Sequence, residues 1–234
     1  MPEARIGLLS CGRVKPEFRH LAGDYPDMFA SLFGDRLQLR DYSLIDGEFP
    51  ESAKENDGWI ITGSPDSVYD DLPWIVRLAD LTREIVDAEV PLMGICFGHQ
   101  MIAHALGGTV ERASQGWGVG VKQVDVMETQ PWMQPPVSGF RILNSHQDQV
   151  TVLPPGARVI ATNRHCPVSA LALGDRVAGF QGHPEFSPAY ARGLMEYRRG
   201  RLIPEEIADE GLASLAAPPD RELLAGWIVT FLTG

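Results

Sequence analysis

Cysteine is scarce in this chain. The 234 residues include three cysteines, Cys11, Cys96 and Cys166. They are too few and too far apart for a disulfide framework, and their odd number leaves at least one thiol free, which fits a reducing compartment. The N-terminal apolar run is too short for a signal peptide, and no run of about 18 apolar residues is present to span a membrane. These absences predict a cytoplasmic protein with no membrane partner.

Clustered positive charge is also missing. Lysine and arginine total 20 against 31 acidic residues, which gives a formal net charge of −11. Surfaces that bind nucleic acid group their Lys and Arg to neutralise phosphates, so we expect no nucleic-acid partner. Metal-ligand spacings are absent as well, because His99 and His104 lie five residues apart and no CxxC or HxxxH pattern occurs. We therefore expect no metal and no cofactor.

The sequence does contain an alternation of short apolar runs with longer amphipathic stretches. Residues 5–9, 58–62 and 91–95 are expected as buried strands, and the apolar spacing over 72–88 predicts a helix. This alternation predicts an α/β fold with an open, mixed, mostly parallel sheet and helices on both faces. Later short strands, punctuated by Pro and Gly, indicate an antiparallel or mixed region: 119–126, 150–153, 159–162, 170–173 and 176–181.

The end of the chain is expected to be helical. Residues 220–232 read as a helix with Asp220 as its N-cap, and its large apolar side chains are spaced as a packing face. Because no repeat or long linker interrupts the sequence, we expect one domain over residues 1–234. Residues 198–234 are then a C-terminal helical extension packed on that domain.

The segment GICFGHQ, residues 94–100, carries the strongest chemical signal. An expected strand leads directly into Cys96, an expected helix follows it, and glycines stand two residues before and two after. This is the pattern of a nucleophile elbow, in which flanking glycines relieve the crowding of a strained turn. The helix N-terminus favours a thiolate, the reactive form of cysteine. We interpret Cys96 as a nucleophile and the other two cysteines as structural.

Two further segments complete a candidate site. His183 and Glu185 follow an expected strand two residues apart, so the carboxylate can orient the imidazole while its other nitrogen serves Cys96. Residues 62–65, TGSP, end another expected strand. Because active crevices of open parallel sheets lie at the carboxyl ends of strands, backbone amides of Gly63 and Ser64, with that of Phe97, are candidates for an oxyanion hole.

These three motifs, in this order, resemble the class I (triad) glutamine amidotransferase family. The resemblance spans roughly residues 6–197 and implies a flavodoxin-like core with a Cys96–His183–Glu185 triad. It implies attack on the γ-amide of glutamine or of a γ-glutamyl compound through a glutamyl-thioester. It also assigns contacts to the glutamyl α-amino and α-carboxylate groups, namely Gln100, Ser145, His146, Gln147 and Asp148.

The resemblance is closest to stand-alone members similar to the amidotransferase half of GMP synthase and to γ-glutamyl peptidases. About 37 residues follow position 197, too few for an ATP-dependent synthase domain. Three interpretations remain open: a self-sufficient hydrolase of γ-glutamyl compounds, a glutaminase subunit feeding ammonia to a separate synthase, and a non-catalytic regulatory module on the same fold. The leaving amine is expected to be chosen by the loops at 66–71, 112–120 and 163–167.

Overall fold

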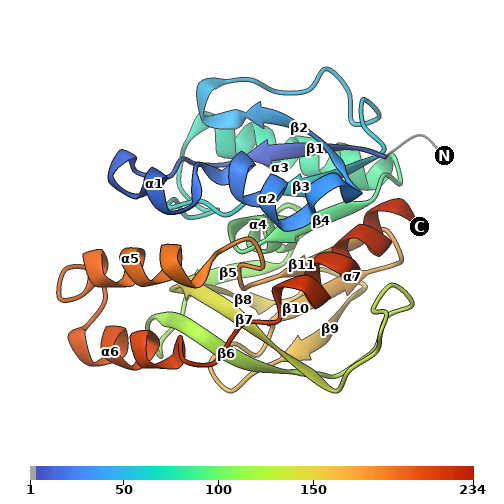
Figure 1. Ribbon diagram of the computed structural model, residues 1–234. Coiled ribbons are helices and arrows are strands. Elements are labelled where there is room, and N and C mark those ends of the chain that lie inside the picture. Colours follow the sequence, from blue (N-terminus) through green and yellow to red (C-terminus); the bar gives the residue numbers. More distant parts are fainter. Residues whose placement is uncertain (1–3) are drawn as a thin grey trace.

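Nine strands form one open sheet in the computed structural model, which describes residues 4–234 (Figure 1). The strand order is β2-β1-β3-β4-β11-β10-β9-β6-β7. The first five strands in this order run parallel: β2 (Gln38–Ser43), β1 (Arg5–Ser10), β3 (Gly58–Ile61), β4 (Leu92–Ile95) and β11 (Val177–Phe180). The remaining strands pair antiparallel: β10 (Ala170–Leu173), β9 (Ala157–Thr162), β6 (Gly118–Val126) and β7 (Gly139–His146). The expected open mixed α/β sheet is confirmed, with the antiparallel part where the punctuated short strands predict it.

Helices cover both faces of this sheet. On one face, α3 (Pro73–Asp87) and α4 (Phe97–Ala105) pack over β3 and β4, while α2 (Tyr25–Phe33) and α7 (Arg221–Thr233) cover the other. Helices α5 (Pro188–Arg198) and α6 (Glu205–Ser214) lie side by side next to β6 and β7 (Figure 1). The remaining elements are short: α1 (Arg19–Ala22), the 3₁₀ turns Pro16–Phe18, Gly34–Arg36 and Leu44–Asp46, and a second sheet of β5 (Thr109–Arg112) with β8 (Asp148–Val152).

Helix α7 buries one of its faces in the core of the domain. Its side chains Trp227, Ile228, Phe231 and Leu232 are buried, as their spacing predicts. Asp220 stands at the N-cap position, but its carboxylate does not cap the helix. It accepts instead from the backbone N–H of Arg141 at 2.7 Å and from the Arg141 guanidinium at 3.1 Å, because β7 passes beside this helix end. Among the helices of residues 4–234, none combines the length and apolar character needed to cross a bilayer.

Two glycines let α4 lie directly against the sheet. A Cβ atom at Gly98 would come within 2.3 Å of the Ile61 carbonyl oxygen of β3, and one at Gly94 within 2.5 Å of the Gly98 carbonyl oxygen. Real Cβ atoms do not approach backbone atoms this closely, so any side chain here would push the helix away from the strands. These contacts fix where the first residue of α4 meets the ends of β3 and β4.

We predict that Gly98→Ala destabilises the protein by about 1–3 kcal/mol or more, the usual cost of overpacking a rigid contact. The measurement is the free energy of unfolding by urea titration. Gly226→Ala is the matched control, because Gly226 lies inside α7 and a Cβ atom there would meet nothing within 4 Å. That control should gain about 0.5–1 kcal/mol from helix propensity. Equal effects of the two changes would contradict the proposed role of Gly98.

Candidate functional site

Cys96 lies at the turn between β4 and α4. Its backbone has φ 53° and ψ −100°, a positive φ that a residue other than glycine rarely adopts. The Cys96 N–H donates to the Phe180 carbonyl of β11 at 2.8 Å, which ties the turn to the neighbouring strand. The side chain is 6% exposed. A strained, anchored turn therefore presents the thiol at the carboxyl end of the sheet.

His183 and Glu185 reach the same place from the end of β11. His183 Nδ1 lies 2.7 Å from Glu185 Oε1, and the carboxylate is almost completely buried. The imidazole stacks on the Phe186 ring with centroids 3.9 Å apart. The backbone N–H of His183 donates to the Leu143 carbonyl at 2.7 Å. Packing and backbone bonding thus restrict the imidazole, and its contact with Glu185 leaves Nε2 as the free ring nitrogen.

The turn after β3 closes the site. A Cβ atom at Gly63 would lie 2.9 Å from His183 Cε1 and 3.8 Å from Cys96 Cβ, so the three strand ends converge here. Within residues 4–234, the backbone N–H groups of Gly63, Ser64 and Phe97 donate to no acceptor. Free amides beside a thiol can bind an anionic oxygen.

The charges in this site favour a protonated His183. Burial lowers the pKa of the imidazole, but the negative charges of Cys96 and Glu185 outweigh burial and raise it from 6.5 to about 10. The other two thiols are in a different environment. Burial raises the pKa of Cys11 far above its ordinary value and that of Cys166 to about 12, so both remain neutral thiols at physiological pH.

Gln181 is a site residue that none of the three sequence motifs indicates. Its side-chain Nε2 donates toward Cys96 Sγ at 3.6 Å. Its Oε1 accepts from Gln100 Nε2 at 3.1 Å, and the same Gln100 amide donates to the Asp148 carbonyl at 2.7 Å. Gln100, an expected substrate contact, is therefore buried and oriented within this chain of amides. The available signal was position: Gln181 is two residues before His183, at the end of the same strand.

The other expected substrate contacts lie around the end of β7. His146 is buried, and burial lowers its pKa to about 3, so the ring is neutral. Asp148 accepts from the Ser67 hydroxyl at 2.5 Å, which joins the loop after β3 to the start of β8. Ser145 accepts at 2.9 Å from Arg198, the last residue of α5.

Gln147 is engaged at the rim of this loop. Its side-chain oxygen accepts from the Arg112 guanidinium at 2.7 Å. The structure thus places all five expected contact residues at one end of the sheet. Ser145, Gln147 and Asp148 are partly exposed, whereas Gln100 and His146 are buried.

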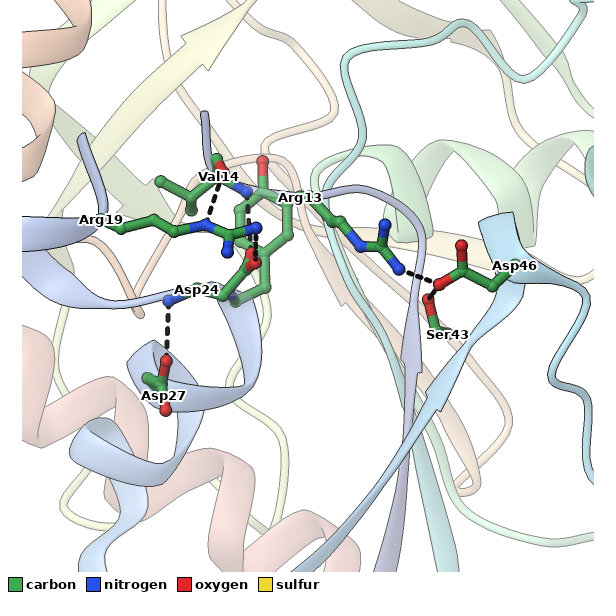
Figure 2. Close-up of polar contacts among 8 residues, drawn as sticks. Arg13, Val14, Arg19, Asp24, Asp27, Ser43 and Asp46 are labelled. Atoms are coloured by element: carbon green, nitrogen blue, oxygen red, sulfur yellow. Dashed lines mark hydrogen bonds and ion pairs between the residues drawn. The ribbon is translucent and has the colours of Figure 1, made fainter. Parts of the chain in front are cut away.

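The loop after β1 lies next to the turn that contains Gly63, and Figure 2 shows the polar contacts that hold this loop. A Cβ atom at Gly12 would lie 3.0 Å from Pro65 Cδ. The Val14 N–H donates to the Asp24 carboxylate at 2.8 Å, and Arg19 forms an ion pair with the same carboxylate at 2.8 Å. Arg13, the residue before Val14, pairs with Asp46. This loop is therefore held in place by charges on both of its sides.

No group of three or more His, Cys, Asp or Glu side chains suited to hold a metal ion occurs in residues 4–234. His99 lies on α4, is fully buried and has a pKa lowered to about 4 by burial. Cys11 is also fully buried, and its backbone N–H donates to the Thr62 hydroxyl at 2.9 Å, so it supports the loop beside the site.

We predict that Gln181→Met slows alkylation of Cys96 at neutral pH by roughly 10- to 100-fold. The change removes the hydrogen bond that Gln181 donates to the Cys96 sulfur, and a hydrogen bond to a charged acceptor such as a reacting thiolate is worth about 1.5–3 kcal/mol. The measurement is the pH profile of the rate with iodoacetamide. Gln149→Met is the matched control, because Gln149 is an equally buried amide bonded to Gln115 and to the His165 carbonyl. The idea fails if the two variants alter the rate to the same extent.

We predict that His183 remains protonated up to about pH 10 and that Cys96→Ala lowers its pKa. Removal of the thiolate leaves burial opposed by Glu185 alone. A raised pKa in the folded state means that protonation stabilises the fold fully below about pH 6.5, and that this contribution disappears as pH rises through about 10. NMR titration of the imidazole resonances measures the shift, and an unchanged pKa in the variant would contradict it.

Comparison with known proteins agrees with this geometry. The family described as "Glutamine amidotransferase class-I" matches residues 37–196. Gamma-glutamyl peptidase 3 of Arabidopsis thaliana is 31% identical over 91% of this chain and 90% of its own. A GMP synthase of Thermus thermophilus is 36% identical over 86% of this chain, which spans 42% of that enzyme.

The fold comparison agrees as well. The crystal structure of a glutamine amidotransferase from Thermotoga maritima superimposes with a TM-score of 0.77 over the whole of both chains, at 20% identity. The chain belongs to the class I glutamine amidotransferase family.

Proposed function

We propose that this protein is a cysteine-dependent hydrolase of γ-glutamyl amides. The observation that carries the proposal is the convergence of Cys96, the His183–Glu185 pair and the free amides of the Gly63 turn at one end of the sheet. Each component of a covalent amide hydrolysis has a candidate there: a nucleophile, an acid–base group with its orienting carboxylate, and donors for an oxyanion.

In the proposed reaction, the Cys96 thiolate attacks the γ-carbonyl carbon and the carbonyl electron pair moves onto oxygen. The N–H groups of Gly63, Ser64 and Phe97 donate hydrogen bonds to that oxyanion. The C–N bond then breaks, and the leaving nitrogen accepts the proton of His183. The amine departs, and the glutamyl group remains bound to Cys96 as a thioester. Neutral His183 next removes a proton from water, which attacks the thioester and releases glutamate and the thiolate. The sum is amide plus water to glutamate plus amine.

Glu185 has a separate role in this proposal. Its buried carboxylate contacts His183 Nδ1, so it selects the tautomer that leaves Nε2 for the substrate and stabilises the imidazolium. Burial makes this contact strong, because no water competes for the carboxylate. The stack of His183 on Phe186 further limits rotation of the ring.

A full-length relationship to γ-glutamyl peptidases favours a self-sufficient enzyme. The chain covers 90% of the Arabidopsis thaliana peptidase but 42% of the GMP synthase, whose remaining length has no counterpart in these 234 residues. The second candidate, a glutaminase subunit that supplies ammonia to a separate synthase, draws on the match to the synthase. The two candidates share the chemistry and differ in the partner.

We predict that Cys96→Ala lowers glutamate release from γ-glutamyl amides by roughly 10⁴-fold or more, because the covalent route is lost. Cys166→Ala is the control and should keep near wild-type activity, since that thiol is buried among structural contacts. The assay is steady-state glutamate release from glutamine and from several γ-glutamyl amides and peptides. Full activity of the Cys96 variant would refute the proposal.

The same assay distinguishes the candidate functions. Turnover of γ-glutamyl peptides by the purified chain alone supports the self-sufficient hydrolase. Activity on glutamine that requires an added synthase supports the subunit. A non-catalytic module is expected to be inactive under both conditions. Its Cys96 is then alkylated no faster than Cys11 or Cys166.

A further inference from the structure

We propose that Arg198 binds a carboxylate of the leaving amine, so that the preferred substrates are γ-glutamyl amides of amino acids or peptides and not glutamine. This inference rests on the proposed function and adds the class of leaving group to it. It follows from three observations: which side of the site Arg198 occupies, which of its hydrogen-bond donors are free, and what lies beside it.

The site has two sides, and Arg198 lies on the His183 side. Side chains alternate along β7, so Leu143 and Ser145 share one face of that strand. Leu143 packs in a cluster with Phe186, the residue on which His183 stacks. Ser145, next on this face, receives the hydrogen bond from Arg198, so the inference assigns it to the Arg198 side and not to the glutamyl contacts that the resemblance implies. Helix α5, which ends at Arg198, lies against β7 on this side (Figure 1).

The amides of Gln100 and the backbone of Asp148 lie on the other side. Gln100 belongs to α4, which packs on the opposite face of the sheet against the cluster that contains Phe97 and Val150. Gln100 and Asp148 are expected glutamyl contacts and are joined by a hydrogen bond on that side, so the inference places the glutamyl group there and the leaving amine toward His183, its proposed proton donor. A leaving group larger than ammonia then passes over the α5 side, where Arg198 lies.

The Arg198 guanidinium has donors to spare. One nitrogen, Nη1, donates to the Ser145 hydroxyl, and within residues 4–234 no carboxylate lies within ion-pair distance of this side chain. Neighbouring carboxylates are already engaged, because Glu196 pairs with Arg192, while Glu205 and Asp209 pair with Arg199. A half-buried arginine with no anionic partner is matched to a carboxylate that arrives with a ligand.

Trp117 extends the same surface. Its indole ring is half-buried, packs against the cluster beside His183 and lies 5.7 Å from the Arg198 guanidinium carbon. The ring gives a flat apolar wall next to the cation, and such a pair suits the backbone and terminal carboxylate of a short peptide. Trp117 also falls in the 112–120 loop, one of the loops expected to choose the leaving amine.

Other cations strengthen the positive potential at this end of α5. Lys15 donates to the Tyr197 hydroxyl at 3.0 Å, and the Arg201 guanidinium lies 4.8 Å from the Tyr197 ring centre. Among the described residues, neither Lys15 nor Arg201 pairs with a carboxylate. These two cations lie near the end of the helix that carries Arg198 and, within residues 4–234, are not neutralised by an ion pair of their own.

The test compares two substrates that differ in one charge, γ-glutamyl-glycine and γ-glutamyl-glycinamide. The wild-type protein should prefer the first in kcat/KM. We predict that Arg198→Gln lowers the ratio of kcat/KM between the two substrates by roughly 10- to 100-fold, the loss expected for a hydrogen bond to a charged group. Arg198→Lys should keep part of the preference, since it retains the charge without the planar fork.

Arg192→Gln is the matched control, because Arg192 lies on the same helix, is exposed and pairs with Glu196. It should leave the ratio unchanged. Equal loss on both substrates in Arg198→Gln would mean that Arg198 only holds Ser145 in place, and would overturn the inference. A wild-type protein that releases glutamate from both substrates without preference would overturn it too, while leaving the proposed hydrolase intact. Release from neither substrate would remove the proposed function itself.

Discussion

The close approach of α4 to the sheet is the constraint on which this site depends. Gly98 meets the Ile61 carbonyl and Gly94 meets Gly98, so the helix starts almost in contact with β3 and β4. The chain makes that turn through a residue with positive φ, and Cys96 occupies this position. The strain at Cys96 is maintained because two backbone contacts and the bond to Phe180 over-determine the turn. In the proposed reaction, a nucleophile held this way needs no movement of its own backbone to meet a substrate.

Burial then sets the electrostatics. His183 and Glu185 are both almost inaccessible, and an isolated charge of either sign would be costly there. Negative charge on Cys96 and on Glu185 outweighs this burial and raises the pKa of His183 to about 10. Gln181 completes the group, since its amide hydrogen bonds the sulfur while Gln100 fixes the amide. In the proposed reaction, the proton that the leaving amine needs is therefore held on the imidazole before the substrate binds.

The sequence predicts the parts of this site that depend on short segments and misses those that depend on contacts between segments. Residues 94–100 and the His183–Glu185 spacing carry their geometry locally, so strand, turn and helix can be inferred directly. Gln181 cannot be assigned a role in this way, because its role exists only once β11 lies beside β4. Strand β7 escapes prediction for a related reason: it is buried on both faces over much of its length and lacks alternation. Asp220 is predicted as a helix cap because aspartate favours that position. No sequence pattern reveals that Arg141 lies beside it and takes its carboxylate.

The C-terminal segment is part of the support of the site and not an appendage to it. Arg221, the first residue of α7, donates to the carbonyls of Pro184 at 3.0 Å and Glu185 at 3.2 Å, so it holds the segment that carries His183. Asp220, one residue earlier, fixes β7 through Arg141, and β7 in turn accepts the backbone bond from His183. Because Trp227 and its neighbours bury α7 in the core, these bonds are made from a rigid base. Packing of the last helix is thereby coupled to the position of the imidazole some 40 residues earlier in the chain.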